Sequence, residues 1–323
     1  MRCKGCYKEV KEGYCLSCRK RLFDARRIPP VLPFEAPNPS NLNLFQEHSK
    51  RMSISGVQLK YSLRLEEDQL TLCETGAQYI LKPAPLSEQL ASPDDVPENE
   101  HLTMQIAEQL FGIQVASNAL IYFRDGIPAY ITKRFDIGAD GHKYMQEDFA
   151  QLTSRSKETH GDAYKYDGSY EEIGQLIRRF VAASAPTLEK FFKQVVFNYI
   201  ISNGDAHLRN FSLIRTDAAE YQLTSAYDLI STVLHTPGES DTALDLYDKD
   251  IDSEFYAAYG YYGRANFMEL AKRLGIVDGR AARIMDQFSA KEGQMRAFVE
   301  RSFLSDAAKG QYISNVVDKL KRI

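Results

Sequence analysis

The octapeptide NGDAHLRN (203–210) places several polar side chains directly after the apolar run VVFNYII (195–201). Asp205 and Asn210 are close enough in sequence for one tight loop to present a proton-accepting carboxylate beside a metal-binding amide oxygen. Asp228, in the segment QLTSAYDLIS, supplies a second carboxylate further along. Oxygen ligands of these kinds suit Mg²⁺. The pattern therefore indicates proton transfer beside a bound magnesium ion.

The D-x4-N spacing is also that of the catalytic loop of protein kinases. Alone it is a weak signal, because Asp and Asn are common in solvated turns. Lys82 ends the apolar segment YILK, as the phosphate-binding lysine of kinases does, and Glu100 follows near the start of a helical segment as a candidate partner. A lysine of this kind, taken alone, is more often a surface residue with a packed stem. The combination predicts an ATP site.

A serine-containing segment, MSISGVQ (52–58), precedes the first expected strand, where a loop covering a nucleotide would lie. It lacks a G-x-G-x-x-G pattern and contains only Gly56. Phosphate contact would therefore rest on backbone N–H groups and on the hydroxyls of Ser53 and Ser55. The alternative is an ordinary serine-rich turn entering a strand.

Four cysteines near the N-terminus have the spacing C-x2-C-x8-C-x2-C: Cys3, Cys6, Cys15 and Cys18. Two such knuckles can direct four sulfurs at one tetrahedral metal, so residues 1–23 are predicted to hold structural zinc. The alternatives are a redox pair, an unliganded tail, or disulfides. Cys73 stands apart and is expected to pack in a core.

The remaining chain divides by its pattern. Residues 24–50 are rich in proline and read as an extended linker. Residues 51–135 contain a three-stranded meander over 56–83, an amphipathic helix ending at Gly112, and a further strand pair. Helical periodicity dominates residues 136–323. We therefore expect an α+β protein with a small β-rich nucleotide-binding lobe and a larger helical catalytic lobe.

The composition predicts a soluble globular protein. The 323 residues are 44% hydrophobic and 26% charged, and no apolar run approaches the roughly 18 residues of a membrane span. No secretory signal is visible, so we expect a cytoplasmic protein without membrane contact. The net charge of −4 argues against direct nucleic-acid binding, although residues 1–27 hold nine Lys or Arg against three Asp or Glu.

The chain resembles the HipA-like serine/threonine kinases, the toxins of bacterial toxin–antitoxin modules, with a two-lobed protein-kinase-like fold. The resemblance extends across roughly residues 50–235. The segments that carry it are SISGVQLK (53–60), YILKPAP (79–85), ENEH (98–101), KRFD (133–136), QEDF (146–149), NGDAHLRNFSL (203–213) and LTSAYDLIS (223–231). The chain looks most similar to the short HipT-type form, because little precedes the serine loop.

This resemblance implies specific roles. Asp205 would be the catalytic base, Asn210 and Asp228 would bind Mg²⁺, and Lys82 would contact the phosphates of ATP. Ser53 and Ser55 would be autophosphorylation sites. The residues expected around the nucleotide are Lys82, Glu100, Lys133, Phe135, Gln146 and His207, with Ser53, Ile54, Ser55, Gly56, Val57 and Gln58 of the serine loop. Lys133 to Phe135 would form the hinge between the lobes, beside adenine.

The resemblance also implies partners. The substrate would be a protein, by resemblance an aminoacyl-tRNA synthetase. The antitoxin would carry a DNA-binding domain, and a separate small protein would correspond to the N-terminal subdomain of longer relatives. The cysteine segment is not part of the family's catalytic core and is treated as an accessory. Two other functions remain open: a small-molecule kinase of similar architecture, and a binding module without catalysis.

Overall fold

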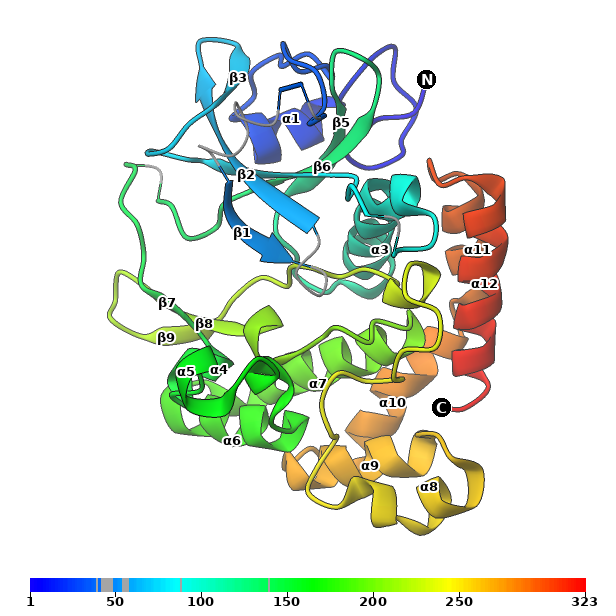
Figure 1. Ribbon diagram of the computed structural model, residues 1–323. Helices are drawn as coiled ribbons and strands as arrows, with labels where there is room; N and C mark the ends of the chain where they lie inside the picture. Colours follow the sequence, from blue (N-terminus) through cyan, green and yellow to red (C-terminus); the bar gives the residue numbers. More distant parts are fainter. Residues whose placement is uncertain (39, 42–48, 54–57, 88, 139) are drawn as a thin grey trace.

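The computed structural model forms two lobes, a β-rich one built from the N-terminal part of the chain and a helical one (Figure 1). The structure describes residues 1–38, 40–41, 49–53, 58–87, 89–138 and 140–323. Among these residues, no helix is both long and apolar enough to cross a membrane. The arrangement agrees with the α+β class expected from the sequence.

The small lobe is built on an antiparallel sheet in the order β1-β2-β4-β6-β5, with β3 also paired to β2. The strands are β1 (Ser49–Ser53), β2 (Gln58–Glu66), β3 (Gln69–Leu72), β4 (Tyr79–Pro83), β5 (Asn118–Tyr122) and β6 (Pro128–Lys133). The predicted meander and strand pair are both present. In β2, Tyr61 and Leu63 are buried on one face. Lys60, between Leu59 and Tyr61, faces the other side.

The cysteine segment covers the outer face of this sheet. Helix α1 (Leu16–Phe23) starts directly after Cys15 and contains Cys18. Phe23 and Leu32 share one apolar cluster with Leu63 and Leu81 of the sheet. The proline-rich chain then runs beside β5: the N–H of Leu32 donates to the carbonyl of Tyr122 at 2.7 Å. From the sequence, we expected the cysteine segment to be an accessory to the lobes. In the structure it forms one layer of the small lobe (Figure 1).

The other face of the sheet carries α3 (Val96–Phe111). This helix ends as predicted, because Gly112 adopts a left-handed conformation with φ of 62°. It is not amphipathic over most of its length, however: up to Ala107 its polar residues are buried as well as its apolar ones. The cause is visible in Figure 1, where α11 (Glu292–Glu300) and α12 (Asp306–Leu320) of the helical lobe lie alongside α3. Thr103 and Tyr312 join α3 to α12 by a hydroxyl hydrogen bond of 3.0 Å.

The helical lobe surrounds α7 (Ser184–Ile200), whose side chains are buried over most of its length. The other helices are α4 (Phe149–Leu152), α5 (Lys157–His160), α6 (Tyr170–Phe180), α8 (Glu254–Tyr259), α9 (Arg264–Arg273) and α10 (Asp278–Ser289). A small antiparallel sheet joins β7 (Gln146–Asp148), β8 (Ser212–Arg215) and β9 (Tyr221–Leu223). The segment between α7 and β8 contains the NGDAHLRN loop.

Candidate active site

The NGDAHLRN loop is held in place by its own first two residues. The side chain of Asn203 accepts a hydrogen bond from the N–H of Asp205 at 3.2 Å and donates to the carbonyl of Asp228 at 3.4 Å. Gly204 permits a close approach, because a Cβ there would lie 2.6 Å from the carbonyl oxygen of Ser240. The loop is therefore fixed to the segment that carries the second predicted metal ligand.

An ion cluster connects the two lobes. The Lys82 ammonium, from β4, lies 2.5 Å from a carboxylate oxygen of Glu100 on α3 and 2.5 Å from one of Asp228. Lys60, from β2, lies 3.1 Å from the other Asp228 oxygen. The Asn210 amide also donates to that oxygen, at 3.3 Å. Two lysines of the small lobe and one amide of the helical lobe thus all contact the Asp228 carboxylate.

The charges in this cluster support one another. Burial alone would raise the pKa of Asp228, but the ammonium groups of Lys60 and Lys82 hold it well below its usual range. Burial would lower the pKa of Lys82, yet Asp228 and Glu100 raise it to about 12. Asp228 therefore stays ionised at neutral pH. Its backbone is also left-handed, with φ of 55°, which is uncommon outside glycine and frequent at functional sites.

Asp205 lies apart from the ion cluster and has different neighbours. The Tyr166 hydroxyl donates to its carboxylate at 2.5 Å, and the Lys165 ammonium lies 3.8 Å away. The His207 imidazole is 3.9 Å from the same oxygen, and burial lowers the pKa of His207 to about 4. His207 is therefore neutral at pH 7. The surroundings of Asp205 thus supply its carboxyl group with a hydroxyl donor.

Phe135 of the predicted hinge and Gln146, predicted near the nucleotide, are connected to Asp228 through aromatic and hydroxyl contacts. The ring of Phe135 lies 5.8 Å from that of Tyr227, which precedes Asp228 in the chain. The Tyr227 and Ser212 hydroxyls are 2.5 Å apart, and the Gln146 amide donates to Ser212 at 3.1 Å. Phe135 and Gln146 are therefore joined to the ion cluster through Tyr227.

Other predicted residues lie elsewhere. The Lys133 ammonium pairs with Asp24 at 2.6 Å, at the end of α1 and away from the ion cluster. Ser53 is the last residue of β1, and its backbone pairs with Gln58 of β2. The rest of the serine loop, Ile54–Val57, which includes Ser55 and Gly56, lies outside the described residues.

Residues 52–295 match the protein family described as the HipA-like C-terminal domain. The chain belongs to the HipA-like family. It is 28% identical over 285 residues to a protein of Haemophilus influenzae named "Putative kinase", a match covering 83% of this chain and 80% of that one. It is 35% identical over 212 residues to "Putative kinase Y4dM" of Sinorhizobium fredii, covering 60% of this chain and 48% of that one.

A solved structure confirms the fold. This HipA-like chain matches HipA of Shewanella oneidensis, solved with HipB and its operator DNA, at a TM-score of 0.63 and 18% identity. The match covers 84% of this chain and 65% of that one. At this identity the likeness extends to the fold alone, and the predicted two-lobed HipA-like class is confirmed. This HipA-like chain spans about half the length of the Sinorhizobium relative.

Sequence reasoning about this HipA-like chain missed three residues of the site. Lys60 alternates with the apolar residues Leu59, Tyr61 and Leu63 in the sequence, and this alternation was the available signal for a second lysine on the opposite face of the strand. Asn203 begins the quoted loop, but its side chain was assigned no role. Tyr166 lies in a segment that reads as a solvated loop, so no sequence signal indicated its contact with Asp205.

Proposed function

We propose that this protein is an ATP-dependent kinase that phosphorylates serine or threonine hydroxyls of a protein. The observation that carries the proposal is the ion cluster: Lys82, Glu100 and Asp228 meet between the lobes, with contacts of 2.5 Å on both sides of the lysine. Asp205 lies on the same loop as Asn210, and the Asn210 amide belongs to the cluster. Such a set provides a cation for phosphate, oxygens for a metal and a base for a hydroxyl.

The reaction is a phosphoryl transfer. The acceptor hydroxyl gives its proton to Asp205 while its oxygen forms a bond to the γ-phosphorus of ATP. The bond between that phosphorus and the bridging oxygen breaks, and ADP leaves with the electron pair. Asp205 contributes by orienting the hydroxyl as well as by accepting the proton. The acceptor must reach the carboxylate oxygen that the Tyr166 hydroxyl now contacts.

The oxygen atoms near Lys82 fit a magnesium site. Asp228 is held ionised, and Asn210 adds an amide oxygen, which together make a hard-ligand set. We assign Mg²⁺ to these two residues, where it would neutralise charge on the phosphates. Lys60 and Lys82 would then turn towards phosphate oxygens. A separate structural zinc is assigned to the four cysteines.

The substrate and partners are proposed from family resemblance. We propose a protein substrate, an aminoacyl-tRNA synthetase, and autophosphorylation at Ser53 or Ser55, where phosphate would place about −1.5 to −2 charges beside the ATP site. The Shewanella HipA was solved with HipB and DNA. We therefore propose an antitoxin partner with a DNA-binding domain, together with a separate small protein of the N-subdomain type. Mass spectrometry finding neither serine phosphorylated in active protein would count against autophosphorylation.

The assignment of Asp205 and Asp228 is tested by Asp205→Asn and Asp228→Asn. Each variant should lose at least about 10³-fold of phosphate transfer from labelled ATP, because base and metal ligand act in the same step. Asp278→Asn, at the exposed start of α10, is the matched control and should keep full activity. Circular dichroism checks that each variant is folded. Activity within tenfold of wild type in either site variant would refute the assignment.

A screen identifies the acceptor. Labelled ATP is offered with purified aminoacyl-tRNA synthetases, with total cell protein, and with small alcohols such as sugars. We expect label on a synthetase at serine or threonine. Label on a small alcohol alone would replace the protein-kinase assignment with a small-molecule kinase.

A further inference from the structure

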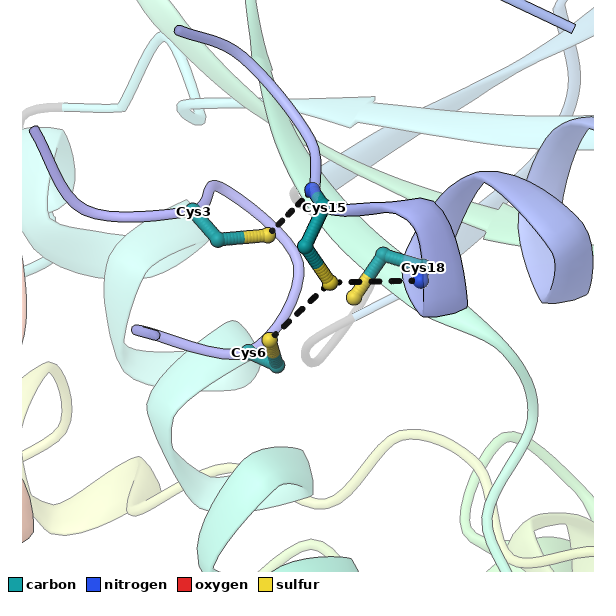
Figure 2. A group of neighbouring side chains, drawn as sticks. All are labelled: Cys3, Cys6, Cys15 and Cys18. Atoms are coloured by element: carbon teal, nitrogen blue, oxygen red, sulfur yellow. Dashed lines mark hydrogen bonds between the residues drawn. The ribbon is translucent and has the colours of Figure 1, made fainter. Parts of the chain in front are cut away.

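The four N-terminal cysteines form a cluster with the geometry of a metal site. The sulfur atoms of Cys3, Cys6, Cys15 and Cys18 all lie within 4.8 Å of one another, and Figure 2 shows them turned towards one centre. All five cysteines of the chain are described, and none is in a disulfide. Three of the four are buried, so four close thiols without a disulfide between them fit a soft, tetrahedral metal ion.

Backbone groups also point at the sulfurs. The N–H groups of Gly5 and Cys15 approach the sulfur of Cys3 at 3.4 and 3.1 Å, and the N–H of Cys18 approaches that of Cys15 at 3.5 Å. Such donors stabilise thiolates, which are the form that binds metal. Gly5 is required for this packing, because a Cβ there would lie 2.7 Å from the Cys18 sulfur. The backbone therefore closes around the four sulfurs and directs N–H groups at two of them.

The cluster is tied to helix α3. Tyr7, directly after Cys6, shares a buried hydrogen bond of 2.8 Å with Nδ1 of His101. The Gln109 amide, two turns further along α3, donates to the carbonyl of Cys6 at 3.3 Å. His101 is the neighbour of Glu100, the partner of the active-site lysine. The first cysteine knuckle thus contacts the helix that carries one half of that ion pair.

The same segment is tied to the strand that carries the other half. Tyr79 lies on β4, three residues before Lys82. Its hydroxyl donates to the carbonyl of Leu22 at 2.9 Å. On β5, the carbonyl of Leu120 accepts from the Tyr14 hydroxyl at 2.8 Å. Tyr14 lies between the two cysteine knuckles. The metal cluster therefore lies between contacts to α3 and contacts to the sheet.

We propose that the four cysteines bind one Zn²⁺ ion, and that this ion fixes α3 against the sheet so that Glu100 meets Lys82. Zinc occupancy then controls how much of the protein is competent for phosphoryl transfer, a consequence that rests on the proposed function. Without the ion, the two cysteine knuckles are joined to one another, in the described part of the chain, only by hydrogen bonds of the backbone and the thiols. The contacts to α3 would loosen with them.

The metal content of the protein tests whether the four cysteines bind zinc. Full-length protein should contain one zinc per chain by mass spectrometry of the metals, and no visible absorption from iron–thiolate bonds. Cys15→Ser combined with Cys18→Ser should remove the zinc. Cys73→Ser, which changes the one cysteine outside the cluster, is the matched control and should keep it. A wild-type chain with substoichiometric zinc after growth in zinc-supplemented medium, or one carrying iron, would overturn the assignment.

Amide hydrogen exchange tests whether the zinc ion fixes α3, and it does so without a measurement of activity. Removing zinc by a chelator should speed amide exchange in residues 96–111 while the buried amides of α7 change little. Tyr7→Phe keeps all four ligands and removes only the hydroxyl that bonds His101. It should retain zinc, speed exchange in α3 by about two- to tenfold, and lower phosphate transfer by a similar factor.

The outcomes separate the proposals. Zinc present, with α3 exchange unchanged both in the stripped protein and in Tyr7→Phe, would refute the coupling. Chelation that unfolds the whole chain leaves Tyr7→Phe to decide it. A wild-type protein that transfers no phosphate would count against the proposed function, while metal content and exchange would still decide the role of the cysteines.

Discussion

At the scale of residues, the central feature is one carboxylate shared by two lysines. Asp228 accepts from Lys82 at 2.5 Å and from Lys60 at 3.1 Å, so its charge is already neutralised. A magnesium ion must displace these ammonium groups, and the phosphates of ATP are the natural new partners for them. Nucleotide and metal should therefore bind with positive cooperativity, each raising the affinity of the other by the same factor.

Lys60→Ala tests this competition. Removing one ammonium should tighten Mg²⁺ binding to the nucleotide-free protein on the order of tenfold, because a positive charge within about 4 Å of the ligand is lost. The same change should weaken ATP binding, since one phosphate partner is gone. Calorimetric titrations with each ligand alone measure both. Arg64→Ala, on the exposed part of β2, is the control. Weaker Mg²⁺ binding in Lys60→Ala would contradict the competition.

Tyr166 makes a second prediction at this scale. Its hydroxyl donates to Asp205 at 2.5 Å, and the acceptor hydroxyl of the proposed reaction would need the same carboxyl group. Tyr166→Phe removes a hydrogen bond to a charged group, so the KM for the protein acceptor should fall by about tenfold. The KM for ATP should not change. If kcat collapses while the acceptor KM stays constant, Tyr166 orients Asp205 instead of competing for it.

At the scale of elements, α3 is unusual because its polar side chains are buried with its apolar ones. Glu98 is 8% exposed, and burial raises its pKa to about 8 although its own backbone N–H and Lys4 oppose the shift. The carboxyl is therefore mostly neutral at pH 7. One of its oxygens, Oε2, is buried without a hydrogen-bond partner in the described part of the chain.

This shift predicts a pH dependence of stability. The pKa of Glu98 is higher in the folded chain than the 4.5 usual for a glutamate, so the folded state binds more protons between those values. Its contribution to the free energy of unfolding is complete below pH 4.5 and is lost as the pH rises through about 8. Glu98→Gln, which stays neutral, should match wild type at low pH and exceed it by a few kcal/mol above pH 8.

Urea unfolding at a series of pH values measures the difference between the two proteins. Glu300→Gln, on the exposed side of α11, reports the general effect of losing one carboxylate. A difference between wild type and Glu98→Gln that stays constant from low to high pH would contradict the assignment of the raised pKa.

The sequence predicted most elements of the sheet and the end of α3, because alternation and a terminal glycine are local signals. It also indicated Lys82, Glu100 and Asp228, which the structure brings together. It did not predict the burial of α3, because α11 and α12 lie nearly two hundred residues further along the chain. The contacts of Tyr166 and Lys60 were missed for the same reason: they depend on distant segments.

At the scale of the whole molecule, the first residues of the chain meet the turn between α11 and α12 beside α3. Arg2 donates to the carbonyl of Arg301, at the end of α11, and the ring of Phe303 lies 3.9 Å from the ammonium of Lys4. The cysteine segment and the C-terminal helices therefore enclose α3 from two sides. The position of Glu100 therefore depends on both lobes, and on segments nearly three hundred residues apart in the chain.

The strip of chain beside β5 has a further consequence. The N–H of Leu32 donates to the carbonyl of Tyr122, and the N–H of Tyr122 donates to the carbonyl of Pro30. The N–H of Leu120 donates to the carbonyl of Lys4. A fragment beginning at residue 52, where the family match starts, would leave that border of the sheet open, together with the apolar surface beneath α1. An open strand border pairs readily with a second chain, so such a fragment would aggregate instead of serving as a minimal enzyme.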